Sequence, residues 1–283
     1  MAITTRDVIT QDFVRDTVEE IVEEELIYRQ AFREIDASGI ESNSYTFYIE
    51  KNDMGRPSIV GENEEAPRHG AQSPEEFTVQ FDKFMGELVI TMEAMEDGLM
   101  EMKAREVENL ARAMAEELNE EAYDAITTAV GANAYTDVSG DNNNTLSFDD
   151  VIQGVKRLRK GPSDVDDTFE PDLMIVDVDG YTDLLTDDNF NRATDAGDEV
   201  VRSGEIQGEV AGVPFVVDTT QDISDSGHGA FLIDTSRFGY ELTRTSMTTR
   251  EYEEPERQAE VVQAYCRKAW TAIFENAVVE VDG

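Results

Sequence analysis

The sequence is poor in the residues that form disulfides, metal centres and basic surfaces. Its 283 residues include a single cysteine, Cys266, two histidines, His69 and His228, and six lysines. One cysteine excludes a disulfide within the chain, and the apolar residues around Cys266 predict a buried thiol. Two histidines so far apart in sequence give neither the spacing of a metal site nor a Ser–His–Asp or Cys–His arrangement. The sequence therefore predicts no metal, no cofactor and no catalytic residues.

Long apolar runs are also absent. No stretch approaches the roughly 18 apolar residues that a membrane-spanning helix needs. The N-terminal segment MAITTRDVITQDFVRD lacks the apolar core of a secretion signal. We therefore expect a soluble protein that is made in the cytoplasm and has no membrane partner.

Acidic residues, in contrast, are abundant: 63 Asp and Glu stand against 23 Lys and Arg, a formal net charge of −40. They are spread along the chain rather than gathered in one tail, and the cations are mostly arginine. Two interpretations compete, a surface that binds cations or basic partners and a surface adapted to molar salt. At about 1 M salt the Debye length falls to about 3 Å, so repulsion between dispersed carboxylates is largely screened. The dispersion and the scarcity of lysine favour an extreme halophile or its virus.

The first third of the chain predicts an arm followed by a long hairpin. Apolar residues recur at helical spacing from Asp12 to about Glu34, which predicts a helix within an extended arm. Alternating strands are predicted at residues 45–50 and 75–84, and the stretch between them is polar and contains several Gly and Pro. Loops of that length are uncommon in compact domains unless they are functional. The open hairpin has little core of its own, so we expect it to rest on something outside itself.

The middle of the chain predicts a strand and one long helix. Residues 86–95 contain a strand, and from Leu99 to Val130 apolar residues fall on one stripe at steps of three and four. The helix spans about 45 Å, which is long for a globular protein. Gly131 stands where a C-terminal cap belongs. We predict a single spine helix lying across a sheet.

The second half of the chain mixes short helices with strands. Ser147, followed three residues later by Asp150, predicts a capping box that opens a helix through about Leu158. A short helix is predicted after a strand at residues 173–178. Further strands are predicted at residues 210–219, 229–235 and 237–253, and as a pair around a turn near Glu275 in residues 261–281. Because strict βαβ alternation is absent, the sequence predicts an α+β fold.

One short motif resembles that of an enzyme family. Asp177 and Asp179 follow an apolar strand in an Asp-x-Asp-Gly pattern, which resembles the nucleophile motif of haloacid-dehalogenase-type phosphatases. There the first carboxylate attacks phosphorus and both bind magnesium. That chemistry also needs a later lysine, and the only lysine after the motif is Lys268, among aromatic residues. A magnesium-dependent phosphatase is therefore an alternative that we do not favour.

The chain has one local basic cluster, at the end of the helix that Ser147 opens. It consists of Lys156, Arg157, Arg159 and Lys160. Cations interact favourably with the C-terminus of a helix, which is sufficient reason for their presence. The alternative is a contact with nucleic-acid phosphates or with an acidic neighbouring subunit, and the sequence leaves both interpretations open.

The order of these elements resembles that of the major capsid proteins of tailed viruses, which share the Hong Kong 97-like shell fold. The likeness is carried by four stretches: ITMEAMEDGLMEMKAREVENLARAMAEELNEEAYDAITTAVGAN, LSFDDVIQGVKRLRK, EVAGVPFVVDT and YCRKAWTAIFENAVVEV. They are similar, in turn, to the family's strand and spine helix, the helix that opens its axial domain, its Gly-x-Pro strand and the closing strands of its peripheral domain. The resemblance covers the chain from about residue 40 to its end.

The resemblance implies a division of the chain into five parts. These are an N-terminal arm (1–42), an extended loop (43–85), a peripheral domain with the spine helix (86–145), an axial domain (146–262) and the closing strands of the peripheral domain (263–283). The arm and the loop are expected to lie along neighbouring subunits. Because the sequence begins almost at the arm, we expect scaffolding to have been removed from it or to be a separate protein.

The resemblance also implies a function without enzymatic activity. We expect a homo-oligomer of pentamers and hexamers that forms an icosahedral shell around double-stranded DNA, assembled in the host cytoplasm and found in the virion. Portal, scaffold and cement proteins are the further partners that the family implies, and the basic cluster is a candidate for facing the DNA or another subunit. Combined with the charge, the resemblance indicates a haloarchaeal virus. The alternative on the same fold is an encapsulin-type compartment, which packages enzymes.

Overall fold

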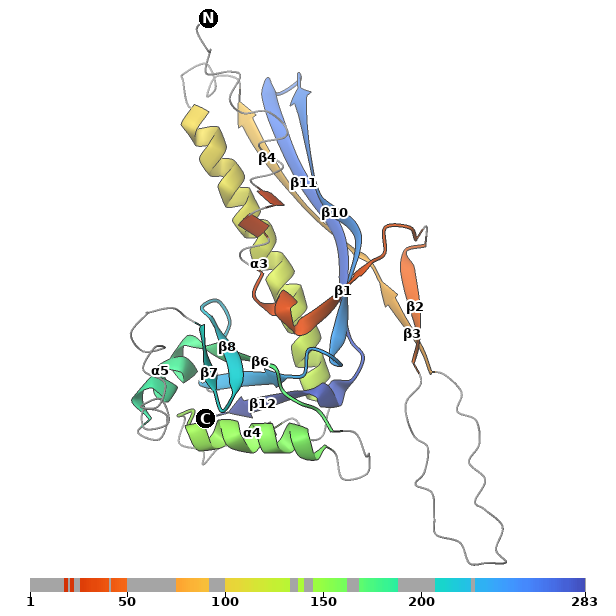
Figure 1. Cartoon of the computed structure of the whole chain (residues 1–283). Helices are drawn as coiled ribbons and strands as arrows, with labels where there is room; N and C mark the ends of the chain where they lie inside the picture. The colour runs from red at the N-terminus through yellow and green to blue at the C-terminus, as the bar shows by residue number, and fades with distance from the viewer. Residues whose placement is uncertain are drawn as a thin grey trace, which may run out of the picture.

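The computed structural model describes residues 18–19, 21–22, 26–40, 42–49, 75–91, 100–132, 137–139, 145–161, 168–187, 207–224 and 227–282. Within these residues the fold is α+β with three sheets, so the predicted fold class is confirmed. A long helix, α3, runs along a tall sheet, and a second sheet lies at the foot of that helix (Figure 1). A two-stranded hairpin stands to one side of both.

The tall sheet contains four strands. Their order is β1 (Phe32–Asp36), β10 (Gly239–Glu254), β11 (Ala259–Ala272) and β4 (Asp82–Thr91). The last three are antiparallel neighbours, whereas β1 joins β10 in parallel. Irregular pairing between Thr243 and Thr248 interrupts the β10–β11 ladder.

Helix α3 (Met100–Ala132) is the predicted spine. Its apolar stripe, which includes Val107, Leu118 and Ile126, is buried against the tall sheet and the core below it. The prediction that Gly131 caps the helix is wrong, because α3 continues through it to Ala132. A single glycine costs a helix about 1 kcal/mol, which is too little to end one by itself.

The predicted helix of the arm is only partly correct. Residues 18–19 and 21–22 are helical, but a short 3-10 turn, η2 (Tyr28–Ala31), leads directly into strand β1. The prediction is therefore wrong from Phe32 to Glu34. Helical spacing of apolar residues could not show that the free edge of β10 would pair with this segment.

The second sheet contains six strands. Their order is β5 (Asp137–Ser139), β12 (Val278–Asp282), β9 (Gly229–Ile233), β6 (Leu173–Asp177), β8 (Val213–Asp218) and β7 (Gln207–Val210). The strand predicted at residues 210–219 is instead part of a hairpin, since Ala211 and Gly212 have φ of 54° and 81° and turn the chain between β7 and β8. Two consecutive residues at positive φ are typical of a two-residue hairpin turn.

Two helices pack on this sheet. Helix α5 (Val178–Thr186) follows β6, as predicted. Helix α4 (Phe148–Lys160) begins at the predicted capping box of Ser147 and Asp150 and ends two residues later than predicted, at Lys160, with Gly161 as its C-cap. The close approach of α4 depends on Gly154, where an added Cβ would lie 2.6 Å from Leu232 Cδ1 and 2.7 Å from Val281 Cγ2.

The prediction that the last two strands of the chain pair with each other is wrong. β11 lies in the tall sheet and β12 in the six-stranded sheet, joined by a 3-10 turn, η3 (Glu275–Ala277). The turn is fixed where the N–H groups of Ile273 and Phe274 both donate to the carbonyl of Phe238, at 2.8 and 3.2 Å. The chain thus crosses from one sheet to the other over five residues, and β12 shares a sheet with strands from the middle of the sequence.

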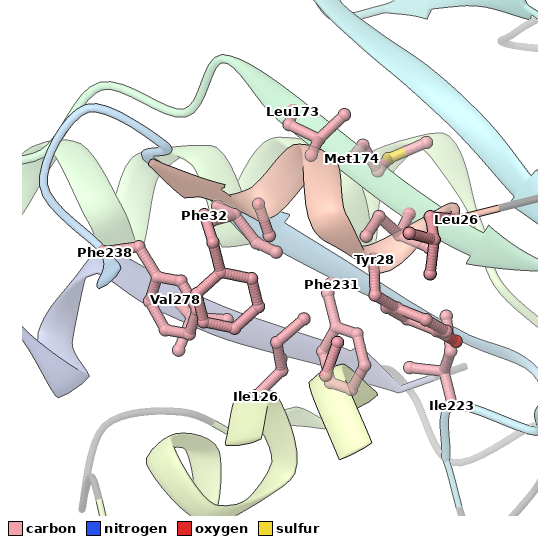
Figure 2. Packing of buried hydrophobic residues seen from close by; sticks show 14 of the residues in the cluster. Leu26, Tyr28, Phe32, Ile126, Leu173, Met174, Ile223, Phe231, Phe238 and Val278 are labelled. Carbon is pink, nitrogen blue, oxygen red and sulfur yellow. The ribbon is translucent and has the colours of Figure 1, made fainter. Parts of the chain in front are cut away.

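One apolar core serves both sheets. Figure 2 shows Ile126 of α3, Phe32 of β1 and Phe231 of β9 converging with Phe238 and Val278. The ring centroids of Phe32 and Phe238 lie 5.2 Å apart. Side chains from both sheets meet in this cluster, so the two sheets and α3 pack around a shared core.

Candidate functional site

The base of the hairpin is anchored to the tall sheet. Its strands are β2 (Ser44–Ile49) and β3 (Glu75–Gln80), with Phe47 opposite Phe77. The ring of Phe47 stacks on Tyr240 of β10 at 5.4 Å, and Phe81 is buried where β3 passes into β4. Separate strands were predicted at residues 75–84 and 86–95, but pairing breaks at Phe81, so β4 takes up the end of the first and most of the second.

Two other aromatic side chains of the hairpin are exposed. Tyr48 is 66% exposed and Phe77 is 40% exposed. A large apolar ring in water carries a free-energy cost that a partner surface would remove. The long polar segment predicted to follow, residues 50–74, lies outside the described residues.

The segment before β1 is bound to the core. The backbone N–H of Ile27 donates to Asn119 Oδ1 of α3 at 3.1 Å. The hydroxyl of Tyr28 donates a short hydrogen bond to Asp218 at the end of β8, and burial together with this carboxylate raises the pKa of Tyr28 above its usual value. The side chains of Val18, Val22 and Leu26 in this segment are also buried. The arm therefore joins the body at α3 and at the six-stranded sheet.

A buried group of charges lies beside this junction. Glu241 of β10 is fully buried, and its carboxylate accepts from Lys268 Nζ at 2.5 Å and from Arg29 Nε at 2.9 Å. Arg29 also pairs with Glu34 at 2.9 Å. Together they tie η2 to two central strands of the tall sheet. A second buried lysine, Lys103 of α3, contacts Glu260 at 2.7 Å and Glu251 at 3.4 Å.

The carboxylates of the phosphatase-like motif have structural partners. Asp177 is the N-cap of α5: it accepts from the N–H of Gly180 at 2.6 Å and from that of Gly229 at 2.7 Å. Burial raises the pKa of Asp177, and these hydrogen bonds oppose that rise. Asp179 is exposed in the first turn of α5, and Lys268 is bound to Glu241 in the other sheet. The motif thus starts a helix, and the lysine that phosphate transfer would need is committed elsewhere.

His228 takes part in a contact that sequence reasoning missed. Its Nδ1 lies 2.6 Å from Asp183 Oδ2, and the same carboxylate accepts from the N–H of Leu146 at 3.1 Å. These bonds join the loop before β9, helix α5 and the start of α4. The separation of 45 residues between His228 and Asp183 gives no sequence signal for the pair.

The predicted basic cluster lies on the last two turns of α4. Lys156, Arg157, Arg159 and Lys160 are all exposed. Among the described residues, no group of three or more His, Cys, Asp or Glu could hold a metal ion. None of the described helices is long and apolar enough to cross a membrane. The candidate functional features of the described chain are the hairpin, the arm junction and the exposed face of α4.

Residues 75–280 match the model of a family described as phage capsid protein. The match covers α3, α4 and every strand from β3 to β11. Among curated proteins, no sequence matches this chain.

Solved structures share the fold at low sequence identity. The capsid of the myovirus phage XM1 is 14% identical, with a TM-score of 0.62 and 91% of each chain covered. The capsid of the cyanophage P-SCSP1u is 10% identical, with a TM-score of 0.66 and coverage of 91% of this chain and 88% of that one. A virus-like particle from Pyrococcus furiosus is 11% identical, with a TM-score of 0.58 and coverage of 96% and 98%. The predicted Hong Kong 97-like fold is confirmed by this likeness together with the family match.

Proposed function

This chain belongs to the phage capsid protein family, and from that premise we propose that it is the major capsid protein of a tailed virus, forming an icosahedral shell of pentamers and hexamers around double-stranded DNA. Proteins of such a family have a structural role in the virion. Portal, scaffold and cement proteins are proposed as further partners, with assembly in the host cytoplasm. The five-part division inferred from the sequence, with boundaries after residues 42, 85, 145 and 262, stays a prediction.

The hairpin carries this proposal. Among the described residues, it is bound to the tall sheet through Phe47 and Phe81, while Tyr48 and Phe77 are exposed. A two-stranded hairpin is marginally stable alone, so it gains stability from a further surface. In a closed shell every subunit can provide that surface for its neighbour, and symmetry satisfies all copies at once. We propose that the hairpin makes these contacts, whereas the described part of the arm is buried against its own subunit.

We also propose a haloarchaeal host. The support is the net charge of −40, dispersed along the chain and accompanied by only six lysines. Subunits that carry such a charge repel one another strongly in dilute buffer, and molar salt removes most of that repulsion.

Negative-stain electron microscopy of the purified chain in molar salt tests the proposal. We expect closed or partial shells. A stable monomer at high salt and high concentration would exclude the shell proposal. The cargo of the native particle then separates a virus from an encapsulin-type compartment: DNA supports the virus, and a packaged enzyme supports the compartment.

A further inference from the structure

The exposed face of α4 concentrates positive charge in a chain that has little of it. Four of the 23 Lys and Arg lie in one five-residue stretch of this helix, residues 156–160, and all four are exposed. Among the described residues, Lys156, Arg159 and Lys160 form no ion pair or hydrogen bond. The two buried lysines are engaged instead, Lys103 with Glu260 and Lys268 with Glu241. Lys156, Arg159 and Lys160 are therefore available to an anionic partner.

No acid offsets this charge on the helix itself. The two acidic residues of α4, Asp149 and Asp150, are in its first turn, and Asp150 is used in the capping box. From Val151 to Lys160 the helix contains no Asp or Glu. Residues three and four apart on a helix lie about 5–6 Å from each other, so Lys156, Arg159 and Lys160 form one compact group.

The fold directs this group away from the body. Leu232 of β9 contacts α4 at Gly154, whereas its neighbour Phe231 faces Tyr123 of α3, with ring centroids 6.0 Å apart. Successive side chains of a strand point to opposite faces, so α3 and α4 cover opposite faces of the six-stranded sheet. Figure 1 shows α4 below that sheet with nothing labelled beyond it. Its outer surface is therefore presented to whatever lies on that side of the shell wall.

The chemistry of this surface suits phosphate better than a protein partner. Protein interfaces are enriched in aromatic residues, methionine and arginine, and they are depleted in lysine. Among the described residues of α4, Ile152 is the large apolar side chain that is exposed, at 41%. Lysine and arginine without base-reading side chains are the groups that contact a nucleic-acid backbone non-specifically.

We propose that Lys156, Arg159 and Lys160 on α4 contact the phosphates of the packaged duplex DNA, so that α4 lines the inner surface of the shell. This rests on the proposed shell function. A wall with a net charge of −40 per subunit would otherwise repel the polyanion that it encloses. The α4 cations place local attraction at the point of closest approach.

Formaldehyde cross-linking of DNA-filled particles, followed by digestion and mass spectrometry, tests the location. The chain has six lysines, of which Lys103 and Lys268 are buried, so few sites can compete. We expect DNA adducts at Lys156 and Lys160 and few at Lys83, an exposed lysine of the tall sheet. Adducts at Lys83 but not on α4 would overturn the proposal. Absence of particles, or particles without DNA, would instead overturn the proposed function.

Charge variants of the full chain test the contact itself. We compare K156Q/R159Q/K160Q with a matched control, R105Q/R250Q/R257Q, which removes the same charge from exposed sites elsewhere. Binding to a fluorescein-labelled 30-base-pair duplex is measured by anisotropy over a salt series in which each variant remains folded. Each lost phosphate contact lowers the slope of log affinity against log salt by about 0.9, so we expect the α4 variant to be shallower than the control by about 2–3. The variant K156R/K160R should bind like the wild type.

Two outcomes contradict the proposal. Equal slopes for the α4 variant and the control would show that only total charge matters. If the α4 variant bound the duplex normally but no longer formed shells, the cations would belong to a contact with an acidic neighbouring subunit.

Discussion

At the scale of single residues, Glu241 holds the junction of arm and sheet together. It is fully buried and has two cationic partners, Lys268 and Arg29. Removing one partner from a buried ion pair leaves the other charge without compensation in a poorly solvated place. The intact group contributes little to the free energy of unfolding, whereas removing one of its charges lowers that free energy strongly.

We predict that Glu241→Gln lowers the free energy of unfolding by about 3 kcal/mol, because Lys268 loses its buried counter-charge. Urea unfolding of the unassembled chain in molar salt measures this. The control is Glu34→Gln, which removes the exposed partner of the same arginine and should cost less than about 1 kcal/mol. Equal losses for the two variants would show that burial does not set the value of this group.

Cys266 gives a prediction about pH. Burial raises the pKa of its thiol from 9.0 to about 11. Between these values the unfolded chain has lost the thiol proton while the folded chain retains it, so stability falls as pH rises through this window. Cys266→Ala should remove that part of the decline, measured as the difference between the two pH profiles of unfolding free energy. Parallel profiles from pH 8 to 11 would contradict the buried thiol.

Residue-scale prediction from sequence succeeded only for local patterns. The buried state of Cys266 and the capping box at Ser147 follow from neighbours in the chain, and both are confirmed. The contact of Arg29 with Glu241 joins residues 212 positions apart, and nothing local marks either as a partner. At Asp177 the local pattern was ambiguous. A helix N-cap and a catalytic carboxylate can both follow a strand in an Asp-x-Asp-Gly motif, and here the residue is an N-cap.

At the scale of elements, two glycines in helices make a matched pair. Gly131 lies near the end of α3 with nothing within 4 Å of an added Cβ, whereas at Gly154 of α4 that Cβ would meet Leu232 and Val281. The cost of glycine in a helix is the same in both, but the space around it is not.

We predict that Gly131→Ala stabilises the chain by about 0.5–1 kcal/mol through reduced freedom of the unfolded chain. Gly154→Ala should destabilise it by about 1–3 kcal/mol, because overpacking forces α4 away from the six-stranded sheet. Thermal unfolding of both variants beside the wild type is the measurement. A stabilised Gly154→Ala would mean that α4 does not pack closely on β9 and β12.

The hairpin separates folding from assembly. Tyr48 is exposed, while Phe47 beside it stacks on Tyr240. We predict that Tyr48→Ser changes the free energy of unfolding by less than about 0.5 kcal/mol yet reduces the yield of shells, because the proposed contact with a neighbouring subunit buries the tyrosine ring. Phe47→Ala should instead lower stability by about 3 kcal/mol or less, because Phe47 is only partly buried. Unfolding curves and particle counts of both variants distinguish the roles, and full shell yield from Tyr48→Ser would remove this ring from the interface.

Elements were predictable where their own periodicity decides them. The apolar stripe of α3 and the alternating pattern of β2 predicted the bounds of both elements to within about two residues. The sequence could not show that Phe32–Asp36 would become a strand, because its partner β10 lies two hundred residues later. For the same reason it could not show that β11 and β12 enter different sheets, since pairing depends on distant edges rather than on the strands themselves.

At the scale of the whole molecule, charge and salt set the conditions for assembly. A net charge of −40 per subunit is repeated over every copy of a shell. We predict that particles lose integrity when monovalent salt falls to tens of millimolar, because the Debye length grows from about 3 Å at 1 M to 10 Å and more at 0.1 M and below. Light scattering during dilution measures this, with dilution at constant salt as the control. Particles that stay whole would undercut the halophilic origin.

The long ladder of the tall sheet gives the subunit a direction of mechanical strength. β10 and β11, of 16 and 14 residues, pair over most of their length, and β4 extends the ladder on the other side of β11. A pull along the strands loads all of these hydrogen bonds at once, in shear. A pull across them peels the bonds open one after another at much lower force. We therefore expect the subunit to be stiff along the axis of this sheet and to yield first across it.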